Sequence, residues 1–92
     1  MPLSGKEINR LRGLAHHLKP IVTVGSAGVT PAVKKELDIA LNHHELVKIR
    51  LPGASKEDKK TALEELCRAT DATPVQLIGR IGVVYRPFDT ND

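Results

Sequence analysis

The order of its sequence patterns predicts an α/β fold for this chain, with elements in the order α-β-α-β-α-β-β. Apolar residues at helical spacing alternate with short β-branched runs, so that two β-α-β crossovers are followed by a hairpin. This arrangement implies a four-stranded mixed sheet with three helices, because the hairpin return makes one strand pair antiparallel. The 92 residues, 40% hydrophobic and 27% charged, have room for a single domain (1–92) with a core at about 4–87.

The first helix is expected over residues 5–18, with its end set by Pro20. Ser4 and Glu7 form a capping box at its start. Its apolar residues follow at helical spacing: Ile8, Leu11, Leu14, Ala15 and Leu18. The β-branched run at residues 21–24 comes directly after Pro20 and predicts a short buried strand.

The second helix is expected to begin with Thr30 as N-cap and Pro31 at its first position, and to run to about Asn42. Its buried face consists of Val33, Leu37, Ala40 and Leu41. His44 continues that face, so we expect it to be buried or half-buried. Residues 46–51 then alternate and predict a half-buried strand. Its apolar side carries Val47, Ile49 and Leu51, and its outer side carries Lys48 and Arg50.

A third helix and a hairpin complete the predicted domain. Ser55 with Asp58 is a weaker capping box. The helix that it opens is expected to bury Leu63, Leu66, Cys67 and Thr70. Residues 75–78 predict a strand, residues 79–82 a turn, and residues 83–85 the returning strand of the hairpin.

The composition excludes several classes of protein. The lone Cys67 leaves no intramolecular disulfide and no cysteine zinc site. No apolar run approaches the roughly 20 residues of a membrane span, and the N-terminal residues lack the apolar core of a signal peptide. We therefore expect a cytoplasmic protein, monomeric, with no membrane partner.

The charge is unevenly distributed along the chain. Residues 1–51 hold eight Lys/Arg against four Asp/Glu, whereas residues 52–92 hold six against seven, and together they give the net charge of +3. The N-terminal half is therefore the candidate surface for a polyanion. Tyr85 and Phe88 are the only aromatic residues, too few for a protein that stacks bases. A bound nucleic acid would be held chiefly by its backbone.

The main candidate site is the glycine loop (residues 25–28), which joins the first strand to the second helix. Its residues are Gly25, Ser26, Ala27 and Gly28. At such a position, free backbone N–H groups and the helix dipole favour an anion, and glycines let a phosphate approach the backbone. Lys34 and Lys35 follow near the helix start, where the dipole disfavours cations. The alternative is a tight turn followed by two solvated lysines.

Other basic residues are candidates for the same nucleic-acid surface: Arg12, Lys19, Lys48, Arg50, Arg80 and Arg86. Each of them, taken alone, can also be an ordinary solvated charge. The loop is neither a P-loop nor a dinucleotide fingerprint, because no Gly-Lys-Ser/Thr follows it and a third glycine is missing.

No pattern in the sequence predicts catalysis, a metal site or a cofactor. The histidine pairs at residues 16–17 and 43–44 are neighbours on helices, so their side chains point about 100° apart and do not chelate one ion. Cys67 lies on a buried helix face and is expected in the core. We therefore expect a non-enzymatic protein without a small-molecule substrate.

Three segments resemble the CRM domain (chloroplast RNA splicing and ribosome maturation), and above all its bacterial stand-alone, YhbY-like members: residues 18–30, 41–49 and 78–87. The resemblance implies a fold like the C-terminal domain of translation initiation factor three, and binding to ribosomal RNA in large-subunit precursors. The family's Gly-x-x-Gly loop corresponds to residues 25–28. Its tip often carries a basic or amide residue, where this chain has Ser26 and Ala27.

Two other functions compete with RNA binding. One is a protein-interaction module whose basic face meets an acidic protein partner. The other is a small hydrolase, ranked last because no site residues support it.

Overall fold

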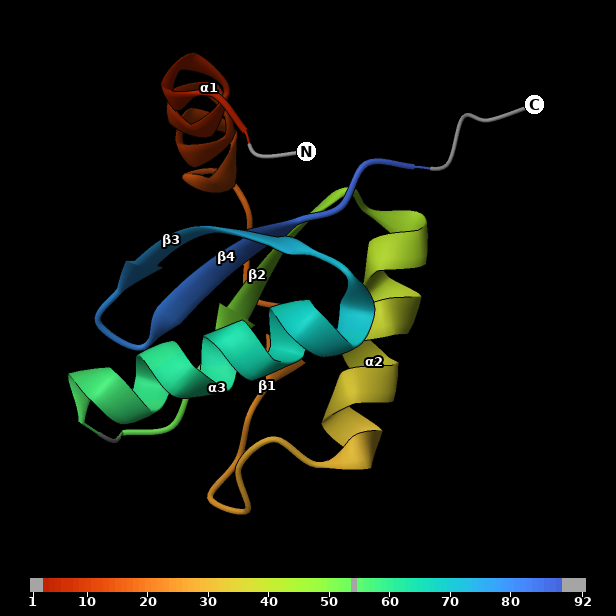
Figure 1. The fold of residues 1–92 in the computed structure, drawn as a ribbon, viewed down its shortest axis with the longest axis vertical. Coiled ribbons are helices and arrows are strands. Elements are labelled where there is room, and N and C mark those ends of the chain that lie inside the picture. Colours follow the sequence, from red (N-terminus) through yellow and green to blue (C-terminus); the bar gives the residue numbers. More distant parts are fainter. Residues whose placement is uncertain (1–2, 54, 89–92) are drawn as a thin grey trace.

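The computed structural model describes residues 3–53 and 55–88, and it confirms the predicted order of elements and the mixed four-stranded sheet. The helices are α1 (Gly5–Ala15), α2 (Pro31–His43) and α3 (Lys56–Thr70). The strands are β1 (Val22–Thr23), β2 (Leu46–Arg50), β3 (Thr73–Ile78) and β4 (Ile81–Tyr85). Figure 1 shows this arrangement.

The strand order of the sheet, β1-β2-β4-β3, determines which loops lie together. β1 is parallel to β2, with Val22 opposite Ile49, whereas β4 is antiparallel to both of its neighbours. The loop after β1, the end of β2 and the β3–β4 turn therefore lie at one end of the sheet, called here the loop end. The starts of β2 and β3 and the end of β4 lie at the other end.

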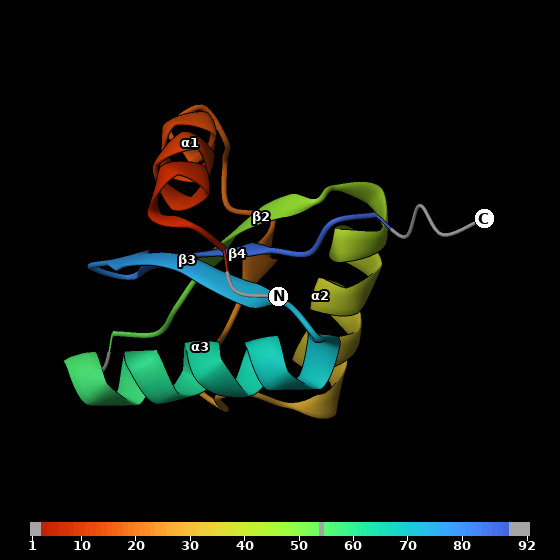
Figure 2. The ribbon, with the colours of Figure 1, turned by 45° about the horizontal axis from the view of Figure 1, so that its top comes forward.

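The two faces of the sheet carry different helices (Figure 2). α2 and α3 cover one face, because the main core cluster joins Leu37 and Leu66 from these helices to Ile49 and Val84 of the sheet. α1 covers the other face through a smaller cluster: Leu11, Ala15, Val75 and Val83. The alternation along β2 sends Val47 and Ile49 towards the first face, so Lys48 and Arg50 lie on the side of α1.

α1 is shorter than predicted and ends at Ala15 instead of residue 18. Leu14 and Leu18, expected on its apolar face, are 50% and 37% exposed, so no packing extends the helix. The chain continues in tighter turns, with His17 N donating to Leu14 O and Leu18 N to Ala15 O.

The first strand was predicted to be buried throughout residues 21–24, but its side chains are alternately exposed and buried. Val22 and Val24 are buried, but Ile21 is 50% exposed. The ladder is short, although the N–H of Ile21 donates to Lys48 O and that of Val24 to Arg50 O. Only one side of residues 21–24 faces the core, because β1 is an edge strand covered by helix on one face.

Two further boundaries of the hairpin differ from the prediction. β3 begins at Thr73 and includes Pro74, which is tolerated because β3 is an edge strand with an irregularity between Pro74 and Gln76. β4 begins at Ile81, so the turn consists of Gly79 and Arg80 alone, and Gly79 has φ +56° as such tight turns require.

His44 is exposed, and the prediction of a buried position was wrong. The chain leaves the helical conformation there, with φ −137° and ψ 121°, so the helical spacing that would have placed His44 on the apolar face no longer holds. The predicted caps at Ser4, with its Glu7 capping box, and at Thr30 are confirmed, whereas at Ser55 the structure has half of the predicted box, the bond from Asp58 N–H to Ser55 Oγ.

Cys67 lies in the main core cluster, as expected, and is 5% exposed. Burial, and to a lesser extent the charge of Glu64, raises the pKa of the Cys67 thiol from 9.0 to about 11. Above pH 9 the unfolded chain releases this proton while the folded chain keeps it. The raised pKa therefore makes the free energy of unfolding fall as pH rises from 9 towards 11.

We expect Cys67→Ala to remove this part of the pH dependence. Urea unfolding of both proteins at pH 8 and pH 10.5 measures it, since other groups that titrate in this range contribute equally to both. Between these two pH values the free energy of unfolding should fall further in the parent than in Cys67→Ala. The difference should be on the order of 1–3 kcal/mol, since one unit of pKa corresponds to about 1.36 kcal/mol. Equal losses in the two proteins would contradict the assignment.

Candidate nucleic-acid interface

The glycine loop closes as a single turn at the loop end of the sheet. The N–H of Gly28 donates to Gly25 O at 3.0 Å, which leaves Ser26 and Ala27 at an exposed tip. Gly28 has φ +79°, a conformation that other residues rarely adopt. Figure 1 shows the loop projecting from the molecule below α2.

Free N–H groups lie both at the tip of the loop and between the loop and α2. The N–H of Gly28 is used inside the turn, and that of Val33 is capped by Thr30 Oγ1 at 3.2 Å. Pro31 at the start of α2 has no N–H. Within residues 3–53 and 55–88, no acceptor contacts the N–H groups of Ser26 and Ala27. A phosphate would therefore meet backbone donors at the tip, and it could also meet those of Val29 and Thr30, for which no acceptor is found in the described residues either.

The two glycines of the loop have different structural requirements. Gly28 is required by its positive φ. Gly25 has no positive φ, and a Cβ added there would meet nothing within 4 Å. The fold itself therefore does not require glycine at position 25, and the absence of a Cβ there leaves the backbone open to a ligand.

Two arginines lie at the loop end of the sheet. Arg50 is opposite Thr23 in the parallel ladder, and its carbonyl accepts the N–H of Val24 at 2.8 Å, so β2 ends beside the entry of the loop. Arg80 lies in the β3–β4 turn, where its carbonyl accepts the N–H of Leu51 at 2.6 Å. Its guanidinium lies over Gly53, because a Cβ added at Gly53 would be 2.6 Å from an Arg80 nitrogen.

The two lysines of α2 differ in their surroundings. Lys34 Nζ pairs with Glu65 Oε2 of α3 at 3.3 Å, which partly neutralises it. Lys35 is exposed, and in the described part of the chain it forms no ion pair. Lys35 is therefore the more available cation near the start of α2.

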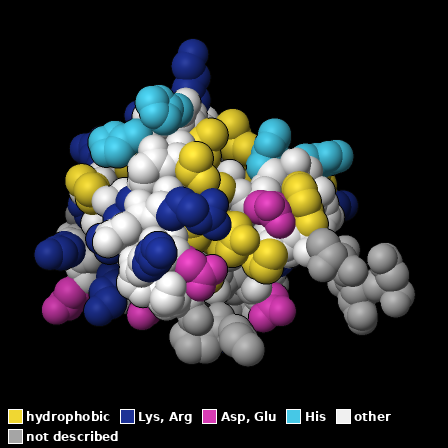
Figure 3. Space-filling view, turned by 90° about the horizontal axis from the view of Figure 1, so that it is seen from above, with side chains coloured by type: hydrophobic (Ala, Val, Ile, Leu, Met, Phe, Trp, Pro, Cys, Tyr) yellow, Lys and Arg dark blue, Asp and Glu magenta, His cyan; other side chains and the backbone are white. Residues whose placement is uncertain are grey.

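Three predicted residues lie away from the loop. Arg12 Nε donates to Val75 O at 3.4 Å, which places it over β3, the edge of the sheet opposite β1. Lys19 precedes β1, and Lys48 is half-buried on the α1 side of β2. Figure 3, seen from above α1, shows lysine and arginine side chains spread among histidine and apolar ones, without a single basic patch.

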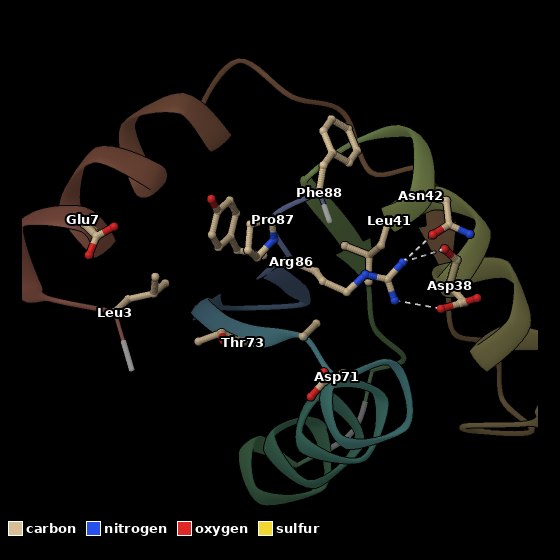
Figure 4. Close-up of a pocket in the computed structure, with 12 residues that line it drawn as sticks. Leu3, Glu7, Asp38, Leu41, Asn42, Asp71, Thr73, Arg86, Pro87 and Phe88 are labelled. Atoms are coloured by element: carbon tan, nitrogen blue, oxygen red, sulfur yellow. Dashed lines mark hydrogen bonds and ion pairs between the residues drawn. The ribbon is translucent and has the colours of Figure 1, made fainter. Parts of the chain in front are cut away.

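Arg86 is held by partners on two helices, of which Figure 4 shows Asp38 and Asn42 on α2; the third, Thr70, lies on α3. One guanidinium nitrogen donates to Asp38 Oδ1 and Thr70 O, both at 2.8 Å; the other donates to Asn42 Oδ1 at 2.8 Å and Asp38 O at 3.3 Å. Its side chain is 20% exposed. The donors of its two terminal guanidinium nitrogens are thus occupied, and we leave Arg86 out of the nucleic-acid interface.

The family-model comparison matches residues 3–86 to the CRS1/YhbY (CRM) domain, nearly the whole chain. The chain belongs to the CRM-domain family. An RNA-binding protein of Haemophilus influenzae is 48% identical over 87 residues, covering 95% of this chain and 88% of its own. The probable RNA-binding protein YqeI of Bacillus subtilis is 37% identical over 89 residues, covering 97% and 93%.

A solved structure supports the CRM fold independently of these sequences. The solution structure of a Staphylococcus aureus protein, described as a hypothetical protein and candidate RNA-binding protein, aligns with a TM-score of 0.86 and 36% identity. The alignment covers 99% of this chain and 95% of that protein. This alignment confirms the predicted fold class over the whole domain, in addition to the order of its elements.

Other kinds of site find no support in the described part of this CRM domain. No group of three or more His, Cys, Asp or Glu side chains there could hold a metal ion. None of the helices described is both long enough and apolar enough to cross a membrane.

The structure also identifies a feature that the sequence did not indicate. Arg86 follows β4 and bonds to Asp38 of α2, 48 residues away in the sequence, and to Thr70 of α3, 16 residues away. A lone arginine after a strand and an Asp–Asn pair four residues apart on a helix are each too common to predict such a contact.

Replacing Arg86 by alanine should destabilise the domain by about 2 kcal/mol, because hydrogen bonds to a charged group contribute roughly 1.5–3 kcal/mol and this one is partly exposed. Arg86→Lys keeps the charge but loses the fork geometry, so it should be intermediate. The exposed Arg10→Ala is the control and should change stability by under about 0.5 kcal/mol. Chemical denaturation measures all three. An Arg86→Ala protein as stable as Arg10→Ala would contradict the structural role.

Proposed function

We propose that this CRM domain binds RNA through its sugar–phosphate backbone at the loop end of the sheet. The observation that carries the proposal is the exposed turn at residues 25–28, whose tip N–H groups are free and whose Gly25 is not required by the fold. Arg50, Arg80 and Lys35 lie at the same end of the molecule. The names of the relatives as RNA-binding proteins agree with this function.

The residue types favour electrostatic binding without sequence preference. Basic side chains and backbone donors recognise phosphates, which carry no sequence information. The two aromatic side chains, Tyr85 and Phe88, line a groove at the opposite end of the sheet, so neither can stack bases at the loop. RNA affinity should therefore fall steeply with salt, with a slope of roughly 0.7–0.9 per phosphate contact.

The finer proposal is that the RNA is ribosomal RNA in precursors of the large subunit, bound by a non-enzymatic, monomeric, cytoplasmic protein. It rests on the resemblance to the YhbY-like members of the family. Sedimentation of cell lysate tests it, by asking which ribosomal particle carries the protein. Absence from every ribosomal particle would reject it while leaving RNA binding intact.

A basic surface could instead bind an acidic protein. The names of the relatives favour the RNA hypothesis, since free backbone N–H groups can bind a phosphate or a carboxylate alike. Affinity for a structured RNA and for an acidic protein, measured in the same salt, separates the two functions.

Changing both tip residues to aspartate (Ser26→Asp with Ala27→Asp) should lower RNA affinity at least tenfold. Two negative charges at about 4–6 Å from a phosphate cost on the order of a few kcal/mol before screening, and about 1.4 kcal/mol suffices for tenfold. Fluorescence anisotropy with a structured RNA measures the change. Thr61→Asp with Ala69→Asp adds the same charge on the exposed side of α3 and should have a much smaller effect.

The folded state of the loop variant should persist, since exposed loop substitutions usually change stability by under about 0.5 kcal/mol. If it folds and binds RNA as the parent does, the loop is only a turn and the proposed contact is wrong.

Glycine substitutions separate the backbone approach from the turn itself. Gly25→Ala should leave stability unchanged, because the added Cβ meets nothing, yet weaken RNA binding several-fold if phosphates approach this backbone. Gly28→Ala should instead lose about 1 kcal/mol of stability, owing to its φ of +79°. Thermal unfolding and RNA titration of both variants test this. Unchanged affinity in Gly25→Ala would show that the backbone at position 25 is not approached.

A further inference from the structure

An open groove of about 1000 Å³ lies at the end of the sheet opposite the glycine loop. Figure 4 shows it between Leu3 and Glu7 on the side of α1, Asp38 on α2, and Asp71 after α3, with Phe88 at its rim. The end of β4 and the residues that follow it form its floor. None of the residues proposed to contact RNA lines this groove.

Both aromatic side chains of the protein line the groove. Tyr85 is half-buried at the end of β4, and Phe88 is 45% exposed. The N–H of Phe88 donates to Glu45 Oε2 at 2.5 Å, so the residue is held in place although it follows the last strand. Exposed aromatic side chains in a concave surface are typical anchors of protein–protein contacts.

The charge of the groove is opposite to that of the protein as a whole. Three carboxylates line it, those of Glu7, Asp38 and Asp71, against the single cation Arg86. Arg86 is bonded to Asp38, Asn42 and Thr70 O, so its two terminal guanidinium nitrogens face the protein. A chain with a net charge of +3 thus has a negatively charged groove at the end remote from its glycine loop.

Asp71 is the carboxylate best placed to meet a ligand. It ends α3 in the left-handed conformation, with φ 59° and ψ 35°, so its position is set by the helix cap. In the described part of the chain its carboxylate forms no hydrogen bond and no ion pair. A cation in the groove would gain this partner without breaking an internal contact.

We propose that this groove is a docking site for a basic segment of another protein, one that places an apolar side chain against Phe88 and Tyr85 and a lysine or arginine beside Asp71. Complementary charge selects this occupant, since carboxylates repel RNA phosphates. The residues that follow Phe88 in the sequence include Asp89 and Asp92, which have the wrong sign to fill the groove. The protein would then bind RNA at one end of its sheet and a basic protein at the other.

The test uses a labelled peptide of alternating lysine and leucine. A glutamate–leucine peptide tests whether the positive charge is needed, and a lysine–glycine peptide tests whether the apolar side chains are needed. NMR titration of the full chain should shift the amides of residues 71–73, 85, 86 and 88 with the lysine–leucine peptide only. Asp71→Asn keeps a residue that tolerates the left-handed conformation, and Phe88→Ala removes the exposed ring. Each should weaken peptide binding by about fivefold or more, the usual effect at an anchor residue.

Matched controls are available elsewhere on the surface. Glu57→Gln removes an exposed carboxylate at the opposite end of α3, and Ile78→Ala removes a side chain that is 62% exposed. Neither should alter peptide binding, and Asp71→Asn and Phe88→Ala should bind RNA as the parent does.

Undiminished peptide affinity in both groove variants would overturn the proposal, and so would equal binding of the glutamate–leucine peptide. RNA shifting the same amides would also overturn it. Failure of the loop variants to affect RNA binding would leave it untouched.

Discussion

The position of the candidate site depends on the parallel pairing of β1 with β2, because this pairing fixes where the glycine loop lies. Val22 opposite Ile49 and Thr23 opposite Arg50 bring a two-residue strand against the centre of the sheet, and Val22 and Ile49 are both fully buried. Because the strands run in the same direction, the loop after β1 emerges where β2 ends. A register shift of one residue would turn Val22 and Val24 out of the core.

The sheet separates two surfaces of opposite character. At its loop end, exposed backbone and the cations of Arg50 and Arg80 suit a polyanion. At its other end, Arg86 joins α2, α3 and β4, and the groove beside it carries carboxylates and both aromatic rings. The two proposed ligands have opposite charge and would not compete, since each surface repels the other's ligand.

The sequence predicted those features that depend on neighbouring residues. The caps at Ser4, Thr30 and Ser55 and the alternation of Val47 and Ile49 each follow from local hydrogen bonding or periodicity, and the structure has them as expected. Leu18 and His44 were wrongly placed because periodicity assumes that a helix continues. Whether it does depends on packing against other elements, which the local pattern does not contain.

In the candidate site, too, some features follow from neighbouring residues and others from contacts between distant ones. The sequence by itself determined the loop, since its two glycines, the strand before it and the N-cap after it are consecutive in the chain. Only the tertiary structure decided which cations accompany it: Arg50 and Arg80 are brought there by strand pairing, Arg12 lies over β3, and Lys34 is partly neutralised by Glu65. Charge can be counted along a sequence, but its partners are set by contacts between residues far apart in the chain.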